Sequence, residues 1–144
     1  MGFLKLRLML IIFLAVFVPD FTIAKSFDFT DWGALLKKYV QLNTIDGIQL
    51  NTVNYGKLQS DPVFPQLVNG LKSFVPSQLQ SHEEKLAFWI NAYNVFAAKI
   101  VIDNYPLKSI KDVGSLFKSV WKRKAGVIGA KEYTLDEIEH DILR

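Results

Sequence analysis

Residues 86–102 form the segment that most constrains the fold, because they are almost entirely apolar and span several helical turns, LAFWINAYNVFAAKIVI. A helix that is apolar on all sides is predicted to lie inside a protein. Two amides, Asn91 and Asn94, interrupt the segment near its middle. A buried amide without a hydrogen-bonding partner costs about 1–3 kcal/mol. We therefore predict a central buried helix whose two amides meet either a polar network or a bound molecule.

The first 24 residues have the pattern of a secretory signal peptide. A positively charged start precedes an uninterrupted apolar run, residues 8–18, and small residues lead up to Ala24. An uncleaved membrane anchor is the alternative, but a spanning helix needs about 20 apolar residues. We expect cleavage after Ala24, which leaves residues 25–144 as an exported protein, periplasmic or secreted, without a stable membrane span.

The composition of the remaining chain excludes several classes of protein. No cysteine is present, so the chain has neither disulfides nor a thiol nucleophile. The net charge is +3 and becomes +2 once Lys5, Arg7 and Asp20 are removed, which favours no strongly charged partner. A basic cluster surrounds Trp121, but an exported hairpin with a few lysines and one arginine is not expected to bind nucleic acid. The alternatives for this cluster are solvated charges or a contact with anionic envelope polymers. Its members are Lys118, Lys122, Arg123 and Lys124.

Periodicity and capping signals predict a helix-rich α+β fold. A central helix over about 82–104 begins at the Ser81–Glu84 capping box. A first helix capped by Thr30 extends to Val40, a second begins at Asp61-Pro62, and a last one follows the Thr134–Glu137 capping box. A small β-hairpin is expected near 120–134, and residues 48–55 suggest a weak strand or an extended loop. The central-helix residues expected in the core are Leu86, Trp89, Ile90, Tyr93, Ala97, Ile100 and Val101, and Phe88 and Phe96 are also assigned to the core.

Three blocks in the second half of the chain together resemble one family. They are LAFWINAYN at 86–94, YPLKSIKD at 105–112 and YTLDEIEHDILR at 133–144. The chain is similar to the domain of unknown function 547 family, closely from residue 84 and loosely from residue 32. The resemblance implies an exported bacterial protein whose relatives continue through a Cys-Ala-Ser segment. On that basis residues 25–144 are expected to be the N-terminal part of a single, truncated domain, with exposed apolar surface that favours self-association. Asn54 stands where the family more often has aspartate.

The candidate site residues lie on the central helix and on the last helix. Asn91, Tyr93 and Asn94 are candidates for ligand binding, and a structural network that fixes loop packing is the alternative. His140 is the candidate acid or base, because histidine titrates near neutral pH, and a packing histidine is its alternative. Glu137 and His140 have a spacing that can hold a metal, but no second pair accompanies them. We therefore expect no metal and no cofactor.

Two hypotheses of function remain open. The full family domain is either an envelope hydrolase or transferase, with the four candidate residues lining its cleft, or a non-catalytic binding or scaffolding module of the envelope. For the chain by itself catalysis is not expected, since no nucleophile or complete site is present.

Overall fold

The computed structural model describes residues 26–114 and 119–144, so the predicted signal peptide, residues 1–24, lies outside the described residues. It has the predicted helix-rich α+β fold. The elements, with η for short helical turns, are α1 Thr30–Tyr39, β1 Val40–Ile45, β2 Ile48–Val53, α2 Tyr55–Leu58, α3 Val63–Ser73, η1 Pro76–Gln78, α4 His82–Asp103, η2 Ile110–Val113, η3 Val120–Lys122, β3 Lys124–Ile128, β4 Lys131–Thr134, α5 Leu135–Glu137 and η4 Ile138–Ile142.

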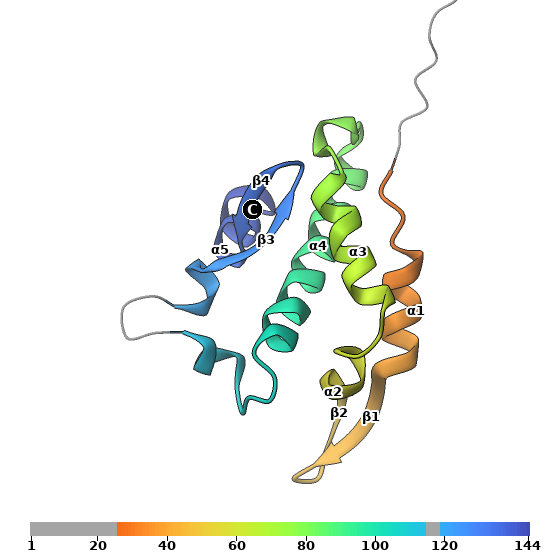
Figure 1. Cartoon of the computed structure of the whole chain (residues 1–144), viewed down its shortest axis with the longest axis vertical. Helices are drawn as coiled ribbons and strands as arrows, with labels where there is room; N and C mark the ends of the chain where they lie inside the picture. The colour runs from red at the N-terminus through yellow and green to blue at the C-terminus, as the bar shows by residue number, and fades with distance from the viewer. Residues whose placement is uncertain (1–25, 115–118) are drawn as a thin grey trace, which may run out of the picture.

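Helix α4 is the predicted central helix (Figure 1). Strand β3 packs against both α4 and α3, and α5 packs against α4. It begins at the expected capping box: the Glu84 amide donates to Ser81 Oγ at 3.0 Å, and the Ser81 amide donates to Glu84 Oε2 at 3.2 Å. By length and composition alone α4 could cross a membrane. Half of its most apolar window is buried in the domain, as in the core helix of a globular protein.

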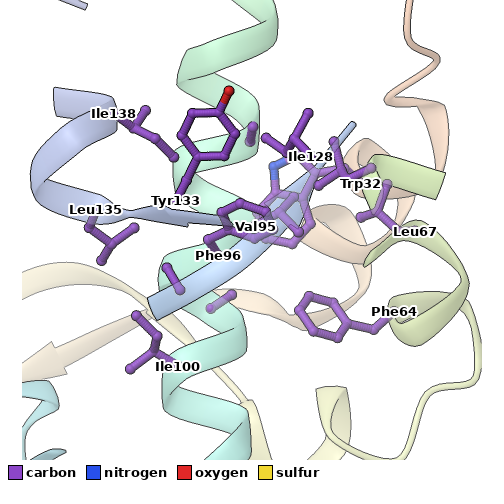
Figure 2. Close-up of a cluster of buried hydrophobic side chains, with 14 of the residues drawn as sticks. Trp32, Phe64, Leu67, Val95, Phe96, Ile100, Ile128, Tyr133, Leu135 and Ile138 are labelled. Carbon is purple, nitrogen blue, oxygen red and sulfur yellow. The ribbon is translucent and has the colours of Figure 1, made fainter. Parts of the chain in front are cut away.

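The hydrophobic core draws side chains from nearly every element (Figure 2). Phe96 of α4 is completely buried, and strand β3 passes directly over its ring. A Cβ at Gly126 of β3 would lie 2.2 Å from Cε1 of Phe96, so the close approach of strand and ring requires glycine. The labelled residues of the cluster are Trp32, Phe64, Leu67, Val95, Phe96, Ile100, Ile128, Tyr133, Leu135 and Ile138.

The buried face of α4 differs from the predicted one. Trp89 and Ile100 are buried as expected, but Tyr93, Ala97 and Val101 are only half-buried. The prediction was wrong for Leu86 and Ile90, which are exposed. The reason is that a helix that is apolar all round offers no periodicity from which to choose its inner side. The core positions of α4 are Phe88, Trp89, Ala92, Val95, Phe96, Ala98, Ile100 and Ile102.

Two antiparallel hairpins complete the fold. The predicted one, near 120–134, is formed by β3 and β4, although residues 120–122 form the turn η3 instead of a strand. The second pairs β1 with β2, from Val40 opposite Val53 to Ile45 opposite Ile48. Each hairpin turns through two residues with positive φ, a geometry whose twist matches that of paired strands.

The start and end of the first helix also differ from the prediction. Thr30 is not its cap, because Asp28 Oδ1 instead accepts a hydrogen bond from the Thr30 amide at 2.8 Å. Val40 begins strand β1 instead of ending the helix. The sequence repeats QLNT at 41–44 and 49–52, and the two copies pair with each other across the hairpin. This pairing, together with the β-branched residues at the strand ends, outweighs the helical periodicity around Val40.

The other two predicted helix starts are confirmed. Asp61 Oδ1 accepts a hydrogen bond from the Val63 amide at 3.0 Å, where α3 begins. At the last helix the Glu137 amide donates to Thr134 Oγ1 at 3.1 Å, and the Thr134 amide donates to Glu137 Oε2 at 2.7 Å. Beyond Glu137 the chain widens into the π-helical turn η4, so the last α-helix expected after this capping box is only partly formed.

Candidate functional site

The two amides of α4 are not buried, and that prediction was wrong. Asn94 is exposed, and Asn91 is half-buried. The Asn91 amide donates from Nδ2 to the carbonyl oxygen of Ala87 at 2.9 Å, one turn back in the same helix. Because both side chains lie toward the side of α4 that carries the exposed Leu86 and Ile90, neither needs a buried polar network to satisfy it.

Tyr93 is the candidate residue that connects α4 to the C-terminal segment. Its Oη lies 3.5 Å from Glu139 Oε2 of η4, the outer limit of a hydrogen bond. Partial burial and then the negative charge of Glu139 raise the pKa of Tyr93 above its ordinary value. Arg144 lies 3.5 Å from the other carboxylate oxygen of Glu139. At neutral pH Tyr93 is therefore a neutral hydrogen-bond donor.

His140 lies on the exposed side of η4. Its Nε2 is 3.7 Å from Asp136 Oδ1, one helical turn earlier, and both side chains are accessible to solvent. Across residues 26–114 and 119–144 there is no group of three or more His, Cys, Asp or Glu side chains that could hold a metal ion. The chemistry available at His140 is thus proton transfer or a salt bridge with Asp136 when the ring is protonated.

The structure brings some of the candidate residues together and not others. Tyr93 and His140 are connected only indirectly: Glu139 contacts Tyr93, and it precedes His140 in the chain. Within the described part of the chain, no hydrogen bond links Asn91 or Asn94 to Tyr93 or His140. The structure therefore joins Tyr93 to the segment that carries His140, but it does not join the four candidate residues into one site.

A groove beside the C-terminal half of α4 is a candidate site that the sequence did not suggest. It holds about 390 Å³, a volume within the range of small-molecule pockets. The apolar lining is mixed with two tyrosines, a lysine and a serine. Its residues are Tyr55, Ala97, Val101, Tyr105, Leu107, Lys108, Ser109 and Ile110. The half-burial of Ala97 and Val101 means that their side of α4 is the floor of this groove.

Helix α2 is held against the end of α4 and forms one wall of the groove. Gln59, just after α2, donates from Nε2 to the carbonyl oxygen of Ile102 at 3.0 Å. Tyr105 crosses over Gly56, where its Oη would lie 3.2 Å from an added Cβ. Burial raises the pKa of the Tyr55 hydroxyl, which therefore stays protonated at neutral pH. Asn54 caps α2 by accepting from the Lys57 amide at 3.1 Å, a task that asparagine performs as well as aspartate.

The sequence held one signal for this groove, the Tyr105-Pro106 pair after the central helix. Helix α4 ends just before this pair, and the chain then turns toward η2 (Figure 1). The reversal brings Leu107 and Ile110 beside α4, and the Ser109–Asp112 capping box fixes the start of η2. A turn after a helix was predictable, but the residues it would bring opposite Tyr55 were not.

The basic cluster near Trp121 is partly engaged in local structure. Lys124 forms an ion pair with Glu132 across the β3–β4 hairpin, and Arg123 donates to the carbonyl oxygen of Val113. Lys122 is exposed, and Lys118 lies outside the described residues. Two of the four charges therefore hold neighbouring segments together.

The comparisons with known proteins agree with the motif blocks. The family model described as "Protein of unknown function, DUF547" matches residues 76–144, which contain all three blocks. This match confirms the predicted family for residues 76–144. The looser likeness over residues 32–75 lies outside the matched segment. No curated protein and no solved structure matches the chain.

Proposed function

We propose that this domain is a non-catalytic binding module of the cell envelope, and that the groove beside α4 is its ligand site. The signal-peptide pattern of residues 1–24 supports export. Seven of the eight residues that line the groove fall within the family segment, and Tyr55 is the exception. The observation that carries the proposal is this groove, which has an apolar floor and a few polar groups at its edges, the usual composition of a ligand pocket.

The lining indicates the chemistry of the ligand. Ala97, Val101 and Ile110 offer apolar contact, so the body of the ligand is apolar or aromatic. Lys108 supplies a positive charge at the groove, and the protonated Tyr55 supplies a donor. A small apolar molecule with an anionic group fits both requirements.

Binding of anilinonaphthalene sulfonate tests the proposal, since this probe combines aromatic rings with an anion. We expect saturable binding to one site, measured by fluorescence titration. Val101→Trp, which fills the groove, should abolish it. Lys108→Gln should weaken binding of the probe about twofold to fivefold, as expected for one exposed charge pair.

The matched control is Lys111→Gln, which removes the same charge from η2 at a residue that does not line the groove. Its affinity for the probe should equal that of the parent chain. Circular dichroism confirms that each variant is folded. Undiminished binding by a folded Val101→Trp chain would contradict the proposal.

A second candidate is an envelope hydrolase or transferase formed by the family's full domain. The observations in its favour are two side-chain pairs near the C-terminal segment, Tyr93 with Glu139 and His140 with Asp136, which come from α4, η4 and α5. In this candidate His140 transfers the proton and Tyr93 donates a hydrogen bond. In a full-length relative, replacement of the residue at the His140 position by alanine should remove turnover and leave thermal stability unchanged. A loss of stability together with activity would instead assign the histidine to packing.

A further inference from the structure

The β1–β2 hairpin extends from the lower end of the molecule in Figure 1 and is exposed along nearly its whole length. Its large apolar side chains face solvent; Leu42, with 62% of its surface accessible, is the most exposed of them, ahead of Ile45, Ile48 and Leu50. A two-stranded hairpin without further packing is marginally stable at best. Its exposed apolar side chains therefore stand to gain from a partner surface.

Strand β1 forms the outer edge of this hairpin, and β2 lies on the side of α2 (Figure 1). Exposed edge strands in proteins are usually protected by charges, prolines or bulges. Strand β1 has none of these protections: residues 40–45 carry no charge and no proline, and they pair with β2 without a break in register. The edge of β1 is therefore open to another strand.

The direction of the backbone groups limits how a second strand can pair. Along an antiparallel strand, every second residue bonds to the neighbour and the others point outward. Ile45 and Ile48 flank the two-residue turn and form a bonded pair. The backbone groups of Leu42 and Thr44 consequently point away from β2. A second strand must therefore place opposite them residues whose own backbone N–H and C=O groups also point outward.

We infer that β1 pairs antiparallel with β1 of a second copy of the chain, across a two-fold axis at Leu42. In this register Leu42 meets Leu42 of the second copy, and the two exposed side chains cover each other. The surface is the same in both copies, as a two-fold interface requires. The partner of this edge is thus another molecule of the same chain, and the pairing is independent of the groove.

Charge complementarity selects this edge and this register. With Leu42 on the axis, Asp46 at the tip of one hairpin comes beside the last turn of α1 of the second copy, which carries Lys38, and the pair occurs twice by symmetry. Lys38 binds Asp61 within its own chain but keeps 63% of its side chain exposed, and Asp46 is also exposed. The equivalent pairing through β2 would centre on Asn51, where two amides would meet without apolar burial or opposite charges.

Cysteine cross-linking tests the register, because the chain has no cysteine of its own. Leu42→Cys places two thiols at the axis, on Cα atoms about 5.5 Å apart, within the range of a disulfide. The matched control is Asn51→Cys, on the residue directly opposite Leu42 in β2. On mild oxidation the Leu42→Cys chain should form a covalent dimer about tenfold faster than the control, because its thiols are held at high effective concentration. Equal rates, or faster linkage at position 51, would overturn the inference.

Sedimentation equilibrium tests the association itself. The parent chain should dimerise with a dissociation constant between micromolar and millimolar, as expected for a small interface. Leu42→Pro removes the outward amide without breaking the β1–β2 ladder, and should weaken the dimer about tenfold. Asn51→Pro removes the outward amide of β2 and should leave the dissociation constant of the dimer unchanged. Val101→Trp, in the groove, should also leave it unchanged. A parent chain that is monomeric throughout, or an equal loss of dimer in a folded Asn51→Pro chain, would show that β1 is not the interface.

Discussion

The two hairpins of this protein have similar local chemistry and opposite surroundings. Each has a two-residue turn in which both φ angles are positive, at Asp46-Gly47 and at Gly129-Ala130. Strand β3 buries Ala125, Gly126 and Ile128 against the core, whereas the residues of β1 after Val40 are all exposed. Turn chemistry therefore accounts for the formation of both hairpins, and packing accounts for how firmly each is held.

The contrast assigns the hairpins to different tasks. The β3–β4 hairpin covers Phe96 of α4 and places the Tyr133 ring in an edge-to-face contact with Trp89, with ring centroids 5.0 Å apart. It is part of the core. The β1–β2 hairpin is fixed at its base, where Asp61 accepts from Tyr39 Oη at 2.6 Å and from Lys38 Nζ at 2.8 Å, and its outer strand is left open for association.

The largest difference is expected between Ile128→Ala and Ile45→Ala. Ile128 is 1% exposed and Ile45 is 48% exposed. Removing a buried isoleucine side chain leaves a cavity and should lower the free energy of unfolding by about 3 kcal/mol. Ile45→Ala removes an exposed side chain and should lower the free energy of unfolding by less than about 0.5 kcal/mol. Urea denaturation of both variants provides the measurement, and equal losses would mean that β1 is packed in solution.

A smaller difference is expected between the two turn glycines. Both have positive φ, so alanine is strained at either by about 1 kcal/mol. A Cβ at Gly129 would in addition lie 2.8 Å from the carbonyl oxygen of Phe74, whereas nothing lies within 4 Å of the Gly47 position. Gly129→Ala should therefore lower the free energy of unfolding by about 2 kcal/mol, roughly twice the loss for Gly47→Ala. Thermal unfolding measures both, and the reverse order would contradict the packing of the Gly129 turn against Phe74.

The smallest effect concerns the base of β1–β2 and depends on pH. Hydrogen bonds from Lys38, Tyr39 and the Val63 amide lower the pKa of Asp61 to about 2. Because the folded pKa is below the unfolded value, the stability contributed by this carboxylate is present above about pH 4 and is lost as the pH falls toward 2. Asp61→Asn should therefore be less stable than the parent at pH 7, and this gap should narrow toward pH 2.

Urea denaturation at pH 7 and at pH 2 measures the difference in the free energy of unfolding between the parent chain and Asp61→Asn. Asp141→Asn is the control, because it removes one charge from an exposed position of η4. Hydrogen exchange adds a local readout: the amides of β1–β2 should exchange faster in Asp61→Asn, while those of β3–β4 should not. If the difference in the free energy of unfolding stays constant from pH 7 to pH 2, the charge of the Asp61 carboxylate is not its cause.

Local signals predicted much of the fold. Capping boxes at Ser81 and Thr134 and the Asp61-Pro62 pair gave the starts of three helices, because a helix start depends on side chains within three residues of it. Strand β1 was missed for the converse reason. Its first residue, Val40, continues a helical stripe from α1, and only pairing with β2 makes residues 40–45 a strand.

The candidate site was less predictable than the fold. Asn91 and Asn94 were expected inside the protein, yet their side of α4 faces outward. The groove depends on Tyr55 meeting residues from 97 to 110, a contact between segments far apart in the sequence. No local sequence pattern in either segment predicts this contact.

The sequence by itself determined that residues 82–103 form a long helix, that a hairpin lies near 120–134, and which family residues 76–144 match. Each of these follows from short-range chemistry or from a motif. The tertiary structure decided which side of α4 is buried, because a helix apolar on all sides can pack in several orientations. It likewise decided which hairpin joins the core and which stays open, since burial depends on the segments that surround a strand.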